Sequence, residues 1–348
     1  MDKKNLSRRE FLHFSASTVL GVASLSIFPL SLLNKFPKER SQMSFLGRVL
    51  YDNITAYLEP NSQSSISAVF SFNDILPVDK VVFGEHSSSH NRLWYELNNG
   101  SFVQASKVQP VENQLNKPRS DISSAGELGT ITVPYTQAWQ SYRSNRKKYR
   151  LFFYGSNHWI IGSVKDEQGN VFYRIRGDRW ENLYYIQAEH MHIFNNADLQ
   201  PLSQQIPPNE KRIEVSLAEQ LLIAYESEKP VFLSHISSGV LTQNEDLLTP
   251  PGEYRICQKR PSRHMIHTDK AGINDVDLYG VPWVSSFTDT GIAFHGTYWH
   301  NDFGKPHSHG CINLPINAAR WIYLWCQPFV PLKRMIINSN QGTRINVF

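Results

Sequence analysis

A cysteine with histidine neighbours lies near the C-terminal end of this sequence. Cys311 directly follows Ser308, His309 and Gly310, and His295 lies upstream. A free thiol with a pKa of about 8.5 is mostly protonated at neutral pH, and it becomes a good nucleophile when a nearby base or positive charge lowers that pKa. We therefore predict that Cys311 is a nucleophile for acyl transfer, activated by an imidazole.

Two histidines are candidates for the base. His309 and Cys311 are two residues apart, so their side chains would share one face of an extended strand. Gly310 between them allows a substrate to approach the backbone closely, and the neighbouring amides are suited to an oxyanion hole. His295 follows the apolar residues 291–294, which are typical of a strand, and it reaches the thiol if the two segments meet in a sheet. Spacing alone leaves the choice between His295 and His309 open.

The same residues resemble a known family. The run from Ser308 to Cys311, with His295 upstream, resembles the active-site signature of L,D-transpeptidases, whose catalytic domain is of the YkuD type. Further resembling positions precede it in the right order: Ser216, Gln220, Ala224, Ser237, Ser238, Gly239, Thr249, Pro250, Pro251, Gly252 and Tyr254. The resemblance covers residues 211–348.

The resemblance implies a role for each reacting group. Cys311 would be the nucleophile, His295 the general base, and the carbonyl of Gly296 the group that orients His295. The implied activity is that of a peptidoglycan L,D-transpeptidase, which forms crosslinks through a cysteine thioester. Its partners would be donor and acceptor stem peptides, and it would need no cofactor and no metal. Carbapenem β-lactams would be expected to acylate Cys311.

The loop before the cysteine would form the oxyanion and substrate site. By resemblance, the amides of His309, Gly310 and Cys311 supply the oxyanion hole, and Ser308 and His309 shape the loop. Asn313 stands where an arginine is frequent in the family, which leaves the contacts to the substrate carboxylate unassigned.

Three other functions compete with crosslinking. An L,D-carboxypeptidase would use the same residues with water as the acceptor. A zinc-dependent hydrolase would use imidazole and thiolate ligands, drawn from His295, His300, His307, His309 and Cys311. A non-catalytic wall-binding protein would need no reactive thiol. Cys257 and Cys326 lack such neighbours, and we assign them no chemistry.

The elements before the catalytic region are predicted to be short strands. Alternating apolar residues and turn signals indicate two β modules, at 46–111 and 128–197, with a linker at 112–127. A weak internal repeat relates 94–97 and 102–105 to 172–175 and 185–188. The modules resemble bacterial SH3-like domains. The predicted fold is therefore mainly β, with two SH3-like modules ahead of a sandwich or barrel-like L,D-transpeptidase domain at 211–348.

Within that last domain, the pattern predicts strands near 213–217, 221–224 and 230–234. The long connection at 264–284 contains Gly272, Gly280 and Pro282. We interpret it as a lid over the donor site or as a surface loop.

The N-terminal residues resemble an export signal. Residues 1–41 combine Arg8 and Arg9 in a twin-arginine pattern with an uncharged stretch from Phe14 to Leu33. The protein is therefore predicted to be exported to the cell envelope, and the sequence leaves open whether the segment is cleaved or retained as a membrane anchor. The formal net charge of +4 is spread along the chain, so nucleic acid is not a predicted partner.

Overall fold

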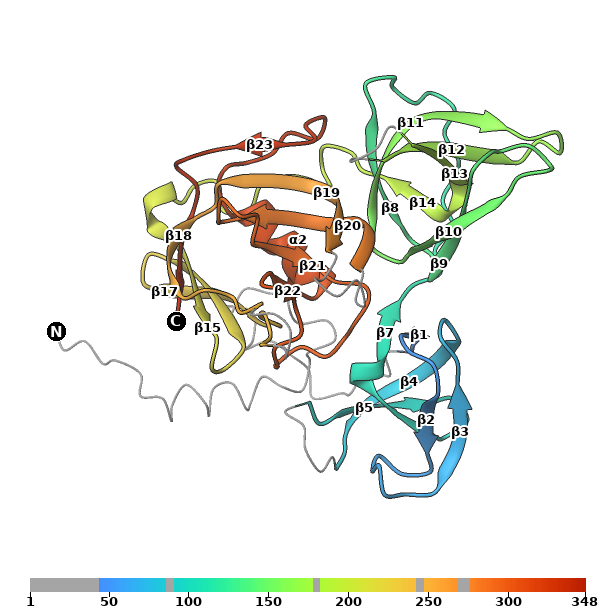
Figure 1. The fold of residues 1–348 in the computed structure, drawn as a ribbon, viewed down its shortest axis with the longest axis horizontal. Coiled ribbons are helices and arrows are strands. Elements are labelled where there is room, and N and C mark those ends of the chain that lie inside the picture. The colour runs from blue at the N-terminus through green and yellow to red at the C-terminus, as the bar shows by residue number, and fades with distance from the viewer. Residues whose placement is uncertain (1–43, 86–90, 178–181, 242–246, 268–275) are drawn as a thin grey trace.

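The computed structural model describes residues 44–85, 91–177, 182–241, 247–267 and 276–348. The predicted export signal at 1–41 lies outside these residues. Within them, the chain is mainly β, as predicted, and forms three β bodies that follow one another along the sequence (Figure 1). None of the helices in the described part is both long and apolar enough to cross a bilayer.

The first two bodies are seven-stranded sheets with the same strand order. The first runs β3-β2-β6-β5-β4-β1-β7 and the second runs β10-β9-β13-β12-β11-β8-β14. The strands of the first are β1 (Phe45–Val49), β2 (Ile54–Tyr57), β3 (Ile66–Phe70), β4 (Ile75–Phe83), β5 (Leu93–Leu97), β6 (Phe102–Gln104) and β7 (Val108–Val111). Those of the second are β8 (Glu127–Ile131), β9 (Tyr135–Trp139), β10 (Lys148–Phe153), β11 (Asn157–Lys165), β12 (Val171–Arg176), β13 (Leu183–Gln187) and β14 (Met191–Ile193).

The shared strand order confirms the internal repeat. The repeat segments expected from sequence lie on β5 and β6 in one body and on β12 and β13 in the other, which occupy equivalent positions. A short 3-10 helix follows each pair, η4 (Ala105–Lys107) and η5 (Ala188–His190), and its first alanine is buried in both bodies. Tyr95 and Tyr173 are buried in the two cores. These aromatics therefore fill the cores and are not exposed for ligand stacking.

The third body is a sandwich of two five-stranded sheets around one helix (Figure 1). One sheet, in the order β17-β16-β15-β24-β18, contains β15 (Lys211–Ser216), β16 (Leu221–Glu226), β17 (Lys229–His235), β18 (Gly252–Arg255) and β24 (Arg344–Val347). The other, in the order β22-β21-β20-β19-β23, contains β19 (Gln258–His267), β20 (Val276–Ser286), β21 (Ala293–Gly296), β22 (Ile312–Leu314) and β23 (Ile337–Asn338). The short 3-10 helix η6 (Pro208–Glu210) precedes β15, and the α-helix α2 (Ile316–Trp325) follows β22.

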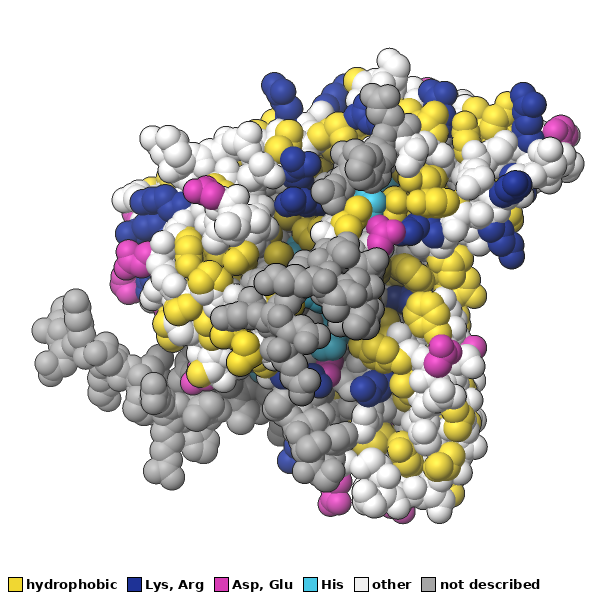
Figure 2. Space-filling view, viewed as in Figure 1, with side chains coloured by type: hydrophobic (Ala, Val, Ile, Leu, Met, Phe, Trp, Pro, Cys, Tyr) yellow, Lys and Arg dark blue, Asp and Glu magenta, His cyan; other side chains and the backbone are white. Residues whose placement is uncertain are grey.

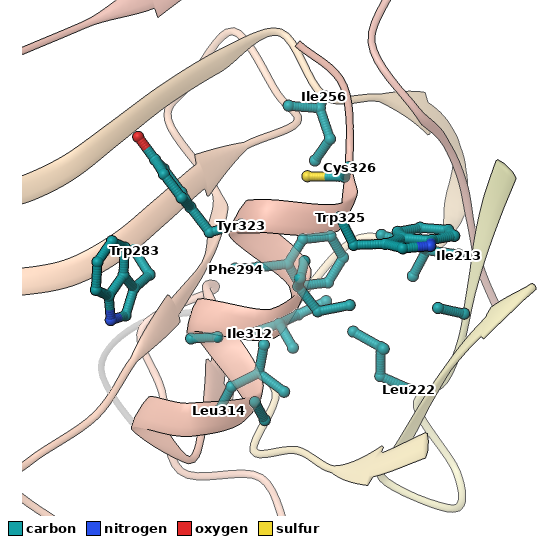
Figure 3. Packing of buried hydrophobic residues seen from close by; sticks show 14 of the residues in the cluster. Ile213, Leu222, Ile256, Trp283, Phe294, Ile312, Leu314, Tyr323, Trp325 and Cys326 are labelled. Atoms are coloured by element: carbon teal, nitrogen blue, oxygen red, sulfur yellow. The ribbon is translucent and has the colours of Figure 1, made fainter. Parts of the chain in front are cut away.

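The interior of the sandwich is built around α2. Its buried residues Ala318, Ala319, Ile322, Tyr323 and Trp325 follow the helical period, so one apolar face is enclosed. Figure 3 shows Tyr323 and Trp325 of the helix among buried side chains from strands of both sheets. Ile213 and Leu222 come from one sheet, and Phe294, Ile312 and Leu314 come from the other. Helix packing therefore joins the two sheets into one core.

Two buried lysines hold the end of this helix. Lys211 Nζ lies 3.1 Å from the carbonyl oxygen of Trp325, and Lys259 Nζ lies 2.9 Å from that of Cys326. The last carbonyls of a helix have no partner within the helix and carry partial negative charge, so ammonium groups stabilise them. Burial lowers the pKa of both lysines from the usual value.

The connection expected at 264–284 is different in the structure. Strands β19 and β20 occupy most of it and pair as a long antiparallel hairpin. Residues 268–275 of this connection lie outside the described residues. The expectation of an irregular lid or loop across the whole segment is therefore wrong, since Gly280 and Pro282 are accommodated inside a strand.

The three bodies meet at Arg48 of β1. This side chain is almost fully buried, and Nη2 donates to the Tyr298 carbonyl of the third body at 2.6 Å. Its guanidinium also lies 4.4 Å from the ring centroid of Phe153, at the end of β10 in the second body. Gln109 of β7 accepts two further hydrogen bonds from it. One cation thus ties both modules to the segment that follows β21.

We expect Arg48→Met to loosen this junction. The change leaves the buried Tyr298 carbonyl without its donor, and a lost hydrogen bond to a charged group costs about 1.5–3 kcal/mol. Burial lowers the pKa of Arg48 to about 10, so the guanidinium is charged at neutral pH. Urea unfolding should show the loss of stability, whereas Arg143→Met, at an exposed position, should change it little. Equal stability of the two variants would contradict the role of Arg48.

Candidate active site

Cys311 and His295 come together through the pairing of β21 with β22. The two strands are parallel, with Phe294 opposite Ile312 and His295 opposite Asn313. Phe294 and Ile312 point into the sandwich core. Because successive side chains of a strand alternate between faces, His295 lies on the opposite face, and so does Cys311, directly before Ile312. The nucleophile and base expected from the sequence therefore share one face of the sheet, one diagonal step apart.

The His295 imidazole is buried and oriented by its own strand. The side chain is 2% exposed, and Nδ1 lies 3.2 Å from the Gly296 carbonyl oxygen. A proton on Nδ1 would be donated to that carbonyl, which leaves Nε2 with a lone pair to accept a proton. Burial lowers the pKa of His295 to about 4, and the nearby charge of Arg263 acts in the same direction. The imidazole is therefore neutral at pH 7, the state that a general base requires.

Cys311 lies in a small apolar cluster. Val281, Val284 and Ala293 form the buried part of this cluster, and Cys311 and Trp299 pack against it. Burial raises the pKa of the Cys311 thiol, although a backbone hydrogen bond from Ala293 and the charge of Arg263 oppose the rise. The resting pair is therefore a thiol beside a neutral imidazole, so the proton moves to His295 during attack and not before it.

The loop before Cys311 is fixed by Thr249. The Thr249 hydroxyl donates to the Gly310 carbonyl at 2.8 Å and accepts a hydrogen bond from the Gly239 amide at 2.9 Å. Gly310 has a φ of +103°. A Cβ added to Gly239 would lie only 2.9 Å from the Cα atom of Gly310. Both positions therefore favour glycine. Gly239 and Thr249 are two of the positions at which the sequence resembles the family, and in the structure their hydrogen bonds hold the loop before Cys311.

A second brace supports the same loop from Gln220. Its side-chain amide donates to the Ser238 hydroxyl and accepts from the Ser238 amide, at 2.7 and 2.8 Å. The Ser238 carbonyl in turn accepts from the amides of His307 and Ser308. The Ser308 hydroxyl donates to the Cys311 carbonyl. These bonds hold the backbone on the N-terminal side of the nucleophile.

Three backbone amides, those of His309, Gly310 and Cys311, were expected to form the oxyanion hole. The Gly310 amide makes no hydrogen bond within the described residues, so it is available to a substrate oxygen. The amide of Ser308, which was expected to shape the loop, donates to Ser238. The His309 side chain is exposed, whereas His295 is buried. Of the two histidines that spacing left open, His295 is thus the one on the buried face with Cys311.

The Asn313 side chain is buried and bonded to a histidine. It is 2% exposed, and its side-chain amide lies 2.8 Å from His300 Nε2. Its backbone exchanges two hydrogen bonds with Ser237, both 2.9 Å. Asn313 therefore supports the second edge of β22, and its side chain is paired with His300.

Histidine side chains reach the surface near the centre of the view in Figure 2. Within the residues that the structure describes, no three His, Cys, Asp or Glu side chains are grouped so that they could hold a metal ion. His300 and His307 are neighbours, with ring centroids 4.3 Å apart. Burial lowers the pKa of both rings. This arrangement gives no support to the zinc-hydrolase alternative.

Arg263 is a residue of the site that the sequence did not indicate. It lies on β19, distant in sequence from the cysteine motif, and its charge acts on both His295 and Cys311. The segment Lys259-Arg260-Pro261-Ser262-Arg263 contains several cations. Arg263 is the one whose charge acts on both reacting groups.

Comparison with protein families identifies the third body. Residues 210–347 match the model of the YkuD family, described as the L,D-transpeptidase catalytic domain. This body is an L,D-transpeptidase catalytic domain. The match begins one residue before β15 and includes the cysteine, the histidine and both braces of the loop. Residues 1–209 lie outside it. No curated protein matches the sequence.

Several solved L,D-transpeptidase structures resemble the chain at low identity. The enzyme from Enterococcus faecium is 22% identical, with 40% of this chain and 50% of that chain covered and a TM-score of 0.31. One from Xylanimonas cellulosilytica is 23% identical, over 40% and 61%, with a TM-score of 0.29. L,D-transpeptidase 3 from Mycobacterium tuberculosis is 13% identical, over 52% and 79%, with a TM-score of 0.33. The chain thus spans about half the length of the first of these structures.

The environment of Cys311 predicts a particular pH profile for its alkylation. Because burial raises the thiol pKa and His295 is neutral, the rate with iodoacetamide should keep rising with pH through the neutral range and beyond. A Cys257→Ala background removes the other partly buried thiol, and the rate is measured by mass spectrometry. A rate that is already constant from pH 6 to 8 would indicate a preformed thiolate and imidazolium pair, and would contradict this electrostatic description.

The Thr249 brace gives a second test. Thr249→Val keeps the volume but leaves the buried Gly310 carbonyl and Gly239 amide unpaired, at a cost of about 1–3 kcal/mol for each unsatisfied group. The variant should lose stability in urea and should also change the alkylation rate of Cys311, because the loop is no longer fixed. Thr249→Ser keeps the hydroxyl and serves as the control. If valine and serine behave alike, the hydroxyl does not hold the loop.

Proposed function

We propose that this protein is a peptidoglycan L,D-transpeptidase that forms crosslinks through a thioester on Cys311. The proposal is supported by the match of residues 210–347 to the L,D-transpeptidase catalytic domain. The observation that carries it is the arrangement of Cys311 and His295 on one face of β21 and β22, with the Gly296 carbonyl beside Nδ1. Because neither group is charged at rest, the chemistry depends on proton transfer between them.

The first step transfers the acyl group to the enzyme. The Cys311 sulfur attacks the carbonyl carbon of the bond between the diamino acid and the terminal D-alanine, and the thiol proton passes to His295 Nε2. The Gly310 amide is placed to stabilise the negative oxygen that forms. The C–N bond then breaks, His295 returns its proton to the leaving amine, and D-alanine departs. The peptide stays attached to the sulfur as a thioester.

The second step releases the peptide to an acceptor. An amine of a second stem peptide attacks the thioester, gives its proton to His295 and forms the new amide. The thiolate leaves and takes the proton back from His295, which restores the starting state. Water in place of the amine gives a tripeptide, which is the carboxypeptidase reaction. The acceptor alone therefore separates these two activities.

We further propose that the protein acts outside the cytoplasm and that its two β modules position the catalytic domain on the wall. The twin-arginine pattern supports export, and the modules are joined to the catalytic domain through Arg48 and Tyr298. Their SH3-like character remains a prediction from the sequence.

The central test is the fate of a tetrapeptide donor. The full chain is incubated with disaccharide tetrapeptide, and the products are analysed by mass spectrometry. We expect D-alanine and crosslinked dimer, with both lost at least about a thousandfold in Cys311→Ala, because residues of a catalytic unit contribute on that scale. Cys257→Ala is the matched control, since this thiol lies outside the site, and it should keep full activity.

Each other outcome assigns a different function. Tripeptide without dimer would indicate a carboxypeptidase. Products that persist unchanged in Cys311→Ala would exclude the thioester mechanism. Activity that a chelator removes and zinc restores would indicate the metal-dependent hydrolase.

A further inference from the structure

Arg263 lies on the same face of the sheet as the two reacting groups. In the register of β19 with β20, Arg263 is opposite Val281. Val281 belongs to the apolar cluster against which Cys311 packs. Directly opposite residues of antiparallel strands point to the same face, so the Arg263 side chain projects from the face that carries Cys311 and His295. Met265, two residues further along β19, belongs to the same cluster, as the alternation requires.

The guanidinium reaches toward the strand that carries His295. Its Nη1 atom lies 4.0 Å from the point that a Cβ on Gly291 would occupy. Gly291 comes two residues before Ala293, the first residue of β21 and a member of the cluster around the thiol. Arg263 therefore crosses the width of β20 and ends beside the entrance to β21.

This guanidinium has no protein partner within the described residues. Neither a hydrogen bond nor an ion pair of its side chain is found there, although the group is partly buried. Other arginines near the hairpin are paired: Arg150 with Asp277 at 2.7 Å, and Arg260 with the side chain of Gln258 at 3.0 Å. A partly buried cation without a counter-charge is costly to desolvate, and its planar fork fits a carboxylate.

We infer that Arg263 binds the C-terminal carboxylate of the donor peptide and so selects donors that end in a free acid. This inference rests on the proposed function, because it names a contact to the donor of that reaction. In the donor, the carboxylate lies on the residue whose amine leaves, only one carbon from the scissile nitrogen. A cation on the face of the nucleophile is placed for that contact, whereas Asn313 is buried against His300. The charge that lowers the pKa of both reacting groups indicates the same proximity.

The first experiment needs no transpeptidase activity. Cys311 is alkylated with iodoacetate, which carries a carboxylate, and with neutral iodoacetamide, in a Cys257→Ala background. Arg263→Gln should lower the ratio of the iodoacetate to the iodoacetamide rate by about tenfold, the factor for one hydrogen bond to a charged group. Arg263→Lys keeps the charge and should keep most of the ratio. A shape change in the site alters both rates but not their ratio.

The second experiment uses paired donors with the full chain. One tetrapeptide donor ends in a carboxylate and the other in a carboxamide. The wild type should prefer the acid, mainly through KM, and Arg263→Gln should raise KM for the acid by about tenfold while leaving the amide donor nearly unchanged. Arg143→Gln, at an exposed position of the second body, is the control and should keep the preference.

The two experiments separate the possible failures. An alkylation ratio that is the same in Arg263→Gln and the wild type would overturn the inference, whatever the enzyme does with peptides. A lowered ratio together with an inactive wild type would retain the carboxylate site and refute only the proposed reaction. An undiminished preference for the acid donor in Arg263→Gln would also overturn the inference.

Discussion

The parallel pairing of β21 with β22 is the constraint on which the site depends. It sets Phe294 and Ile312 in the core, and the alternation of side chains then places His295 and Cys311 on the other face. A slip of one residue in this register would turn the thiol inward and leave the imidazole alone. The bonds from Ser237 to Asn313, and from Thr249 to Gly310, fix β22 and its preceding loop from the other side. These contacts therefore hold the register between β21 and β22.

Burial of the pair then decides its electrostatics. An apolar environment disfavours the charged form of any group, so it raises the pKa of the thiol and lowers that of the imidazole. The site therefore holds two neutral groups, and charge forms only when a substrate arrives. The same environment strengthens the effect of each nearby charge, which is why the guanidinium of Arg263 on β19 acts on both groups.

The fold was partly predictable because strand patterns are local. Alternating apolar residues indicated two β modules, and a weak internal repeat related them, whereas their shared strand order was found in the structure. The hairpin of β19 and β20 was mistaken for a loop, since Gly280 and Pro282 are turn signals in isolation. In the structure both residues lie within β20, which pairs with β19.

The sequence by itself determined which reactive side chains are available and predicted the chemistry they would perform. Residue types and their order around Cys311 predicted a thiol nucleophile, a glycine-containing oxyanion loop and a histidine base, because reactivity belongs to side chains. The family resemblance named His295, but only the tertiary structure placed it on the same face as Cys311, buried Asn313 beside His300, and brought Arg263 from a distant strand to the site. Those outcomes depend on strand register and burial, which arise from contacts between segments far apart in the chain, and no local pattern of residues encodes them.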